Sequence, residues 1–124
     1  MNLIQEIAFT CYAVTDMERS RAFYEGVLGL VPTMVKETVG GKWVEYEIRP
    51  GTFSLGQSPL FPPSKTGASI AFEMIDFDLA IARLKEAGVT FRMGPLETPV
   101  CHMAMVEDPD GSMVCIHKRK SGHN

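Results

Sequence analysis

Two stretches of the chain show the same pattern of hydrophobic and polar positions, 60 residues apart. Each begins as an apolar, strand-like run and closes on an aspartate, Asp16 in the first half and Asp76 in the second. Apolar residues at helical spacing follow each aspartate, and a glycine, Gly29 or Gly88, follows the last of them. Because acidic residues favour the first turn of a helix and glycine favours its end, we expect one helix in each half.

Three short segments of strand-like composition follow each expected helix. They are Val31–Glu37, Lys42–Arg49 and Thr52–Gln57 in the first half, and Val89–Met93, Cys101–Glu107 and Ser112–Lys118 in the second. Turn-forming residues break the chain between them, among them Gly40-Gly41, Gly94-Pro95 and the run 108–111, Asp-Pro-Asp-Gly. Each half therefore predicts the order β-α-β-β-β, with the helix on one face of a mixed sheet.

The expected domain organisation follows from this repeat. Residues 58–66 form a proline-rich connector, which cannot continue a β-ladder. We therefore expect an α+β fold in one domain over residues 1–124, made of two βαβββ modules. Module 1 covers about residues 1–57, the linker 58–66, and module 2 about 67–120.

Composition narrows the classes of protein to consider. The 124 residues carry a formal charge of −3, which argues against broad binding of nucleic acid or of an anionic membrane. No apolar run reaches the roughly 20 residues that a membrane-spanning helix needs. The 3 cysteines form an odd set without CxxC spacing, as is typical of reduced thiols. We expect a cytoplasmic protein with neither nucleic-acid nor membrane partners.

Three motifs carry a resemblance to a known family. Residues 14–30 contain Phe23-Tyr24 and end in Leu28-Gly29-Leu30, and the second half adds the segments 84–89 and 107–112. Together they resemble the vicinal oxygen chelate superfamily, which includes glyoxalase I, extradiol dioxygenases, fosfomycin-resistance enzymes and bleomycin-binding proteins. The resemblance implies that two βαβββ modules form a cupped sheet with helices on its convex side and a ligand in its concave face. It also implies a homodimer.

The same resemblance locates the family's metal ligands. Enzymes of this superfamily hold a divalent metal through His, Glu or Gln on the first and last strands of each module. Those positions hold Phe9, Ser54, Ser69 and Cys115 here. Phenylalanine and serine are poor ligands for a catalytic divalent ion, and one cysteine cannot hold such an ion alone. We therefore expect no metal of the family type and no cofactor.

Strand alternation indicates which side chains share the expected ligand-binding face, because alternate residues of a strand point to the same side. Phe9 and Cys11 share it in the first module, and Ser69 and Glu73 in the second. The last strand contributes Met113, Cys115 and His117.

The turn at residues 108–111 extends this reasoning to the neighbouring strand. A four-residue loop pairs residue 107 with residue 112, which places His102 opposite His117 on the ligand-binding face. A slip of one residue would reverse the assignment. With Cys115 nearby, these histidines could orient a ligand, act as a general base, form a zinc or copper site unlike the family's, or simply be solvated.

One further strand presents an aromatic and acidic face, because Trp43, Glu45 and Glu47 alternate with apolar residues. Trp43 is the candidate for stacking on a flat ligand. The candidate ligand-binding residues are Phe9, Cys11, Trp43, Ser54, Ser69, Glu73, His102, Met113, Cys115 and His117.

The sequence favours a metal-free protein that binds a small organic molecule. Two alternatives remain open. One is a metal-independent enzyme of isomerase or lyase type that transfers protons through His or Glu. The other is a metal-dependent glyoxalase- or dioxygenase-type enzyme whose ligands lie at other positions. The sequence does not decide whether the protein is an enzyme.

Overall fold

The structure is a computed structural model that describes residues 3, 7–59, 62–64, 70–99 and 101–121. The chain divides into two compact units, unit 1 (Met1–Pro63) and unit 2 (Ser64–Asn124). Their boundary falls inside the expected linker at residues 58–66. That the two units make one domain stays a prediction.

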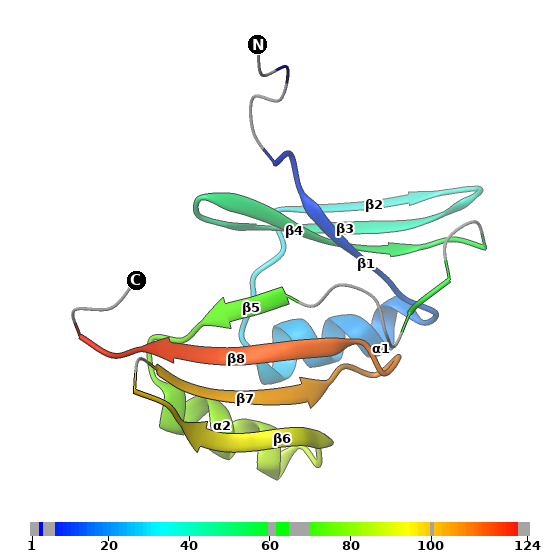
Figure 1. Ribbon diagram of the computed structural model, residues 1–124. Helices are drawn as coiled ribbons and strands as arrows, with labels where there is room; N and C mark the ends of the chain where they lie inside the picture. The colour runs from blue at the N-terminus through cyan, green and yellow to red at the C-terminus, as the bar shows by residue number, and fades with distance from the viewer. Residues whose placement is uncertain (1–2, 4–6, 60–61, 65–69, 100, 122–124) are drawn as a thin grey trace. The chain divides into compact units, whose positions relative to one another are not determined.

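Unit 1 is a four-stranded mixed sheet with one helical segment (Figure 1). Its elements are β1 (Thr10–Ala13), α1 (Met17–Arg21), a π-helical continuation η1 (Ala22–Val27), β2 (Met34–Thr38), β3 (Gly41–Ile48) and β4 (Gly51–Gln57). The strand order is β1-β4-β3-β2, in which β1 runs parallel to β4 and the other pairs are antiparallel.

Unit 2 repeats this topology. Its elements are β5 (Ile70–Glu73), α2 (Phe77–Glu86), β6 (Phe91–Glu97), β7 (Cys101–Glu107) and β8 (Met113–Arg119). The strand order is β5-β8-β7-β6, with β5 parallel to β8 (Figure 1). The predicted fold class, α+β with two βαβββ modules, is confirmed. Among the described residues, no helix is both long and apolar enough to cross a membrane.

Both helices begin and end where the sequence predicts. Asp16 Oδ1 accepts a hydrogen bond from Arg19 N at 3.1 Å, and Asp76 Oδ1 accepts one from Leu79 N at 3.0 Å. Each aspartate thereby satisfies one of the N–H groups that a first helical turn leaves unpaired. After the helices, Gly29 and Gly88 have φ values of 82° and 72°, in the left-handed region that favours glycine.

The first helix departs from the uniform α-helix that its spacing predicts. In its second half Leu28 N donates to Phe23 O at 3.1 Å, one residue further back than in an α-helix. There Glu25 pairs with Arg21, Nε to Oε2 at 2.6 Å, and accepts a hydrogen bond from the buried Tyr46 hydroxyl at 2.9 Å. These contacts tie the helical segment to β3.

The hydrophobic core of each unit lies between the helix and one face of the sheet. In unit 1, Tyr24 of η1 packs against Phe53 of β4, with ring centroids 5.2 Å apart. In unit 2, Leu84 of α2 is fully buried. The buried strand residues on these two helix-facing sides are Tyr12, Val44, Tyr46, Phe53, Leu55, Phe72, Ala104, Val106, Val114 and Ile116. The opposite face of each sheet carries most of the candidate site residues that the structure describes, and His102 is an exception.

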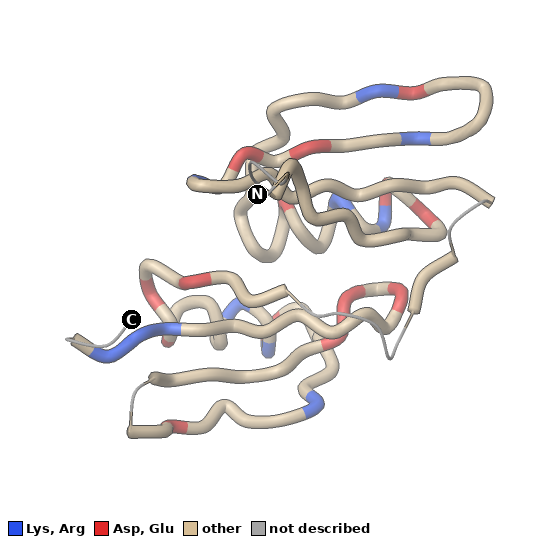
Figure 2. The backbone as a smooth tube through the Cα atoms, turned by 45° about the horizontal axis from the view of Figure 1, so that its top comes forward, with Lys and Arg blue, Asp and Glu red and all other residues tan. Residues whose placement is uncertain are grey.

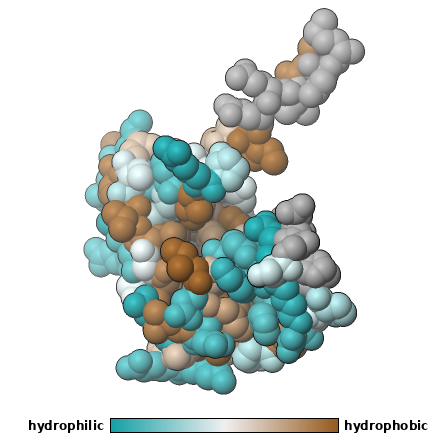
Figure 3. Space-filling model, turned by 90° about the vertical axis from the view of Figure 1, so that its left-hand side faces the viewer, coloured by the Kyte–Doolittle hydropathy of each residue, from teal (hydrophilic) through white to brown (hydrophobic). Residues whose placement is uncertain are grey.

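Several large apolar side chains are exposed in both units, among them Val31, Val35 and Ile75. Figure 3 shows brown apolar patches interleaved with hydrophilic ones on the face that it presents. Exposed apolar residues are ordinary on a protein surface.

The expected break at Gly94-Pro95 is wrong. Strand β6 runs through this dipeptide, and the irregularity appears as shifts of register between Met93 and Leu96. Gly94 has a φ of 77°, and a Cβ at its position would lie 2.9 Å from Met103 O. Glycine therefore lets the bulged strand stay paired with β7.

The expected register of β7 and β8 is also wrong by one residue, because Glu107 pairs with Met113 instead of residue 112. The reason is the turn. Asp108 Oδ1 accepts hydrogen bonds from Asp110 N at 3.0 Å and Ser112 N at 2.8 Å, and Asp108 N donates to Ser112 O at 2.8 Å. These bonds close the loop over three residues, ending at Gly111 with a φ of 84°.

Candidate functional site

The sheet face of unit 1 opposite α1 brings together four of the predicted site residues. Cys11 of β1 pairs with Ser54 of β4, Ser54 pairs with Glu45 of β3, and Trp43 lies two residues before Glu45. Phe9, just before β1, reaches the same place, because its ring contacts that of Trp43. We call the surface formed by Phe9, Cys11, Trp43, Glu45 and Ser54 the aromatic face.

Two contacts on the aromatic face hold the indole ring of Trp43 in place. Trp43 Nε1 donates a hydrogen bond to Glu45 Oε2 at 2.8 Å. Phe9 meets the indole edge to face, with centroids 5.5 Å apart and an interplanar angle of 87°. Phe9 is 49% exposed, so this aromatic pair is accessible from outside unit 1. Two aromatic rings held in fixed orientations suit contact with a planar organic molecule.

Cys11 and Ser54 lie deeper in the aromatic face. The Ser54 side chain is fully buried, and its hydroxyl donates to Thr10 O at 3.4 Å. Burial raises the pKa of the half-buried Cys11 thiol, and the hydrogen bond with Ser54 only partly offsets that rise. A thiol kept neutral in this way is a packing group and a weak nucleophile.

In unit 2, Glu73 and His117 meet on the sheet face opposite α2. Strand β5 pairs Glu73 with His117 of β8, and His117 Nδ1 lies 2.7 Å from Glu73 Oε1. A carboxylate only accepts hydrogen bonds, so Nδ1 donates in this contact, and in a neutral imidazole Nε2 is then the acceptor. This arrangement orients an imidazole for general-base catalysis or for coordination of a metal.

Glu73 is also held by the basic C-terminal end of β8, visible as the blue stretch near the C-terminus in Figure 2. Its Oε2 accepts a hydrogen bond from Arg119 N at 2.7 Å. Burial acts to raise the pKa of the Glu73 carboxyl, but the Arg119 N–H, the contact with His117 and the Arg119 charge together lower that pKa.

Cys115 and Met113 lie on the same face of unit 2. Cys115 pairs with Ala71 of β5 and with Met105 of β7. Burial, with a smaller contribution from Cys101, raises the pKa of the Cys115 thiol. Met113 pairs with Glu107 at the start of β8 and is half-buried.

His102 does not belong to this face, which corrects the sequence-based prediction. The register places Met103, and not His102, opposite His117. His102 lies on the helix-facing side, where its ring centroid is 5.7 Å from that of Phe77, the first residue of α2. The expected cluster of His102, Cys115 and His117 is therefore not formed. Ser69 lies outside the described residues, and its role stays a prediction.

Phe9 and Ser54, two of the positions expected to correspond to the family's metal ligands, offer no metal-binding group in this structure. Phe9 offers an aromatic ring, and the buried Ser54 hydroxyl is hydrogen-bonded to the backbone. Within residues 3, 7–59, 62–64, 70–99 and 101–121, no three His, Cys, Asp or Glu side chains are grouped so as to hold a metal ion.

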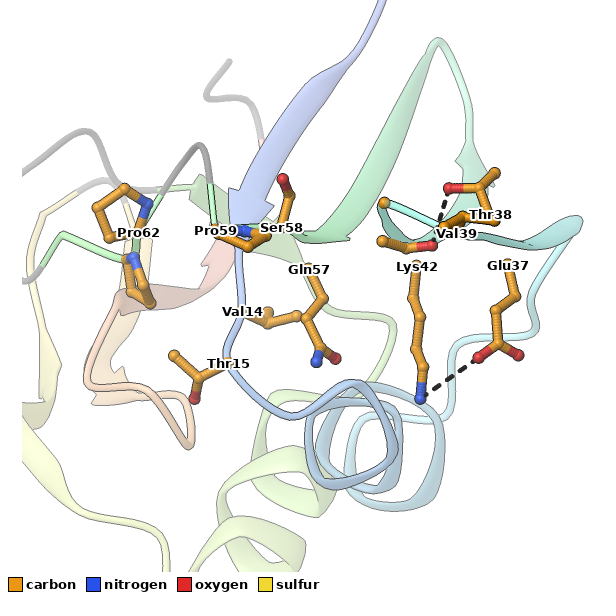
Figure 4. A pocket seen from close by; sticks show the side chains of 13 residues that line it. Val14, Thr15, Glu37, Thr38, Val39, Lys42, Gln57, Ser58, Pro59 and Pro62 are labelled. Carbon is orange, nitrogen blue, oxygen red and sulfur yellow. Dashed lines mark hydrogen bonds and ion pairs between the residues drawn. The ribbon is translucent and has the colours of Figure 1, made fainter.

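Sequence reasoning missed a cavity of about 520 Å³ in unit 1 (Figure 4). It lies between the hairpin turn of β2 and β3, the end of β4 and the prolines that follow. At its polar side Lys42 Nζ pairs with Glu37 Oε1 at 3.7 Å, and Thr38 Oγ1 donates to Gly41 O at 3.2 Å. The sequence marks the Gly40-Gly41 turn and the proline-rich stretch only as breaks between strands, but both line this cavity.

Comparison with solved structures finds antibiotic-binding proteins among similar folds. The crystal structure of TnmS3, an antibiotic binding protein from Streptomyces sp. CB03234, is 27% identical, with a TM-score of 0.74 over 97% of this chain and 100% of that one. A glyoxalase/bleomycin resistance protein from the same organism is 29% identical, with a TM-score of 0.73 over 91% of this chain and 100% of that one.

A glyoxalase I from Leishmania major shares the fold at 20% identity, with a TM-score of 0.76 over 93% of this chain and 87% of that one. A search of curated protein sequences finds no significant match. The sequence model of the Glyoxalase/Bleomycin resistance protein/Dioxygenase superfamily matches residues 6–116, nearly the whole chain. The chain therefore belongs to the Glyoxalase/Bleomycin resistance protein/Dioxygenase superfamily.

Proposed function

We propose that this protein binds a small, planar organic molecule on the aromatic face of unit 1 and does so without a divalent metal. The observation that carries this proposal is the arrangement of Phe9, Trp43 and Glu45. The indole is held by its hydrogen bond to Glu45 and buttressed by the Phe9 ring, while Phe9 stays accessible. Because the rings are already ordered, a ligand gains contact area at little cost in side-chain entropy.

The chemistry of the surrounding positions supports metal independence. A ligand on the aromatic face meets Phe9 and the half-buried, neutral Cys11 thiol, while the Ser54 hydroxyl beside them is buried and hydrogen-bonded to the backbone. None of these groups is a usual ligand of a catalytic divalent ion in these states. The similarity to TnmS3, an antibiotic binding protein, supports an antibiotic as the class of ligand. The rings of Phe9 and Trp43 favour a planar aromatic one.

The single tryptophan of the chain makes the test specific, because Trp43 is the only source of indole fluorescence. Purified protein in a chelator is titrated with a panel of planar aromatic antibiotics, and quenching of Trp43 fluorescence is recorded. We expect saturable quenching by at least one compound. Phe9→Ala removes one wall of the surface and should weaken that binding by about tenfold, the effect of losing about 1.4 kcal/mol.

Val39→Ala is the matched control, since Val39 is a fully exposed apolar residue of unit 1 that lines the cavity of Figure 4 and not the aromatic face. It should leave the affinity unchanged. Loss of binding in Val39→Ala with retention in Phe9→Ala would move the site to the cavity and contradict the proposal.

The contact between Glu73 and His117 favours a second candidate, a metal-independent enzyme that transfers protons. His117 Nε2 would act as the base, and Glu73 would stabilise the charged imidazolium that forms. The test is to incubate a bound ligand with the protein and with His117→Gln and to analyse the ligand by NMR. An isomerised or cleaved product with the unaltered protein alone supports catalysis. An unchanged ligand in both samples contradicts it.

The homodimer, the cytoplasmic location and the lack of nucleic-acid partners also belong to this proposal. Sedimentation velocity should give the mass of two chains of 13.7 kDa. A monomer at all concentrations would contradict the dimer.

A further inference from the structure

The one-residue shift between β7 and β8 creates a surface that sequence reasoning did not predict. It brings Met103 opposite His117 and Met105 opposite Cys115, on the side of unit 2 that faces away from α2. The next strand continues the row, since Met93 of β6 pairs with Met105. Met113 adds a further thioether on the same side of β8. We call Met93, Met103, Met105, Met113 and Cys115 the sulfur face.

Three residues of the sulfur face, Met103, Met105 and Cys115, form a compact group with His117. Directly paired residues of antiparallel strands have Cα atoms roughly 4.5–5.5 Å apart, and residues two apart on a strand are separated by about 7 Å. The pairs Met103–His117 and Met105–Cys115 therefore occupy the corners of a small rectangle. Side chains of this length can converge on one point above its centre.

The burial pattern agrees with this arrangement. Along β7 the helix-facing Ala104 and Val106 are fully buried, whereas Met103 and Met105 between them are only half-buried. The two thioethers thus stand on the outer side of the sheet of unit 2.

Glu73 orients the imidazole of His117 through a hydrogen bond. Its Oε1 lies 2.7 Å from His117 Nδ1, an arrangement that leaves the lone pair of Nε2 to coordinate a metal in the neutral imidazole. A carboxylate that accepts from the distant nitrogen of a coordinating histidine is the common outer-shell arrangement at metal sites.

The donor set selects the kind of ion. Two thioethers, one thiol and one imidazole are soft or borderline ligands, which favour Cu(I) over the hard or borderline divalent ions that the family's enzymes use. Coordination by Cys115 displaces the proton of its thiol to solvent.

We propose that unit 2 binds one soft monovalent metal ion of the Cu(I) type, independently of the organic ligand proposed for unit 1. The four ligating residues are Met103, Met105, Cys115 and His117. The ion is held by two cross-strand pairs of one hairpin, and Glu73 positions the imidazole.

The test is anaerobic competition for Cu(I) between the full chain and a chromogenic Cu(I) chelator. We expect one Cu(I) per chain, with Ag(I) as a redox-inert competitor and Zn²⁺ ineffective. The double variant Met103→Leu/Met105→Leu keeps side-chain volume and apolar character, so it should fold. It should weaken Cu(I) binding by at least the roughly 10- to 100-fold that loss of an outer-shell partner causes, and Glu73→Gln should fall within that range.

Met34→Leu in β2 of unit 1 is the matched control, because it removes a half-exposed thioether remote in sequence from the proposed ligands. It should bind Cu(I) as the unaltered chain does. Three results would overturn the proposal: no Cu(I) bound, equal binding of Zn²⁺, or an affinity that depends on Cys115 alone and survives the double methionine variant. None of these results changes the Trp43 fluorescence titration, so the two proposals fail separately.

Discussion

The surroundings of Trp43 could be predicted from the sequence only in part. Alternation along β3 places Trp43 and Glu45 on the outer side of the sheet and Val44 and Tyr46 in the core, as the sequence predicts. The hydrogen bond from the indole to Glu45 follows from the spacing of two residues on one strand. The contact with Phe9 could not be predicted in the same way, because it joins side chains 34 positions apart that only the folded unit brings together.

Tyr46 carries a prediction at the scale of the single residue. Its hydroxyl is buried with the ring and donates to Glu25, which also pairs with Arg21. Tyr46→Phe removes a hydrogen bond to a charged acceptor, so we expect a loss of about 1–2 kcal/mol in the free energy of unfolding. Urea denaturation followed by circular dichroism measures it.

Glu25→Gln retains an acceptor for Tyr46 and serves as the comparison. It should lose less stability than Glu25→Ala. A Tyr46→Phe variant as stable as the unaltered chain would show that this hydrogen bond does not hold the helical segment to β3.

At the scale of elements, the turn between β7 and β8 shows where sequence reasoning stops. The residues 108–111 correctly predict a turn, and β7 begins and ends where expected. The loop length was not predictable from residue types alone. It depends on one carboxylate oxygen of Asp108, which accepts hydrogen bonds from two backbone N–H groups. These hydrogen bonds make the register differ by one residue from the predicted one, so that Met103 lies on the outer face in place of His102.

Asp108 should therefore contribute measurably to stability. Asp108→Ala leaves the N–H groups of Asp110 and Ser112 without their acceptor in a largely buried turn. We expect a decrease of about 1–3 kcal/mol in the free energy of unfolding, measured by urea denaturation. Asp108→Asn keeps an acceptor oxygen and should restore most of the loss. Equal effects of the two substitutions would contradict the role assigned to that oxygen.

The contacts of Glu73 in β5 with His117 and Arg119 in β8 predict that the stability of the protein depends on pH. The pKa of Glu73 is lowered in the folded chain, so its contribution is present above the unfolded pKa and is lost as the pH falls through the folded value. Because Glu73 is about one-third exposed, we expect only about 0.5 kcal/mol at neutral pH.

Glu73→Gln is the variant for this measurement. Its stability should fall below that of the unaltered chain at pH 7, and the two should converge in acid, as followed by urea denaturation across the pH range. A difference between them that grows as the pH falls would contradict the assignment.

At the scale of the whole molecule, the internal repeat is the feature that the sequence predicts best. The parallel pair Cys11–Ser54 of unit 1 has its counterpart in Ala71–Cys115 of unit 2. The two units have the same topology but different outer faces, aromatic in unit 1 and sulfur-rich in unit 2. Topology follows from the period of the hydrophobic pattern, whereas the chemistry of each face depends on individual residues.

The central claim is that the protein binds a planar organic ligand without a divalent metal. Titration of Trp43 fluorescence with a planar aromatic antibiotic, on one preparation before and after dialysis against EDTA, tests it most directly. We predict saturable quenching with the same Kd in both samples. Quenching that disappears after dialysis and returns on addition of a divalent metal ion would contradict the claim.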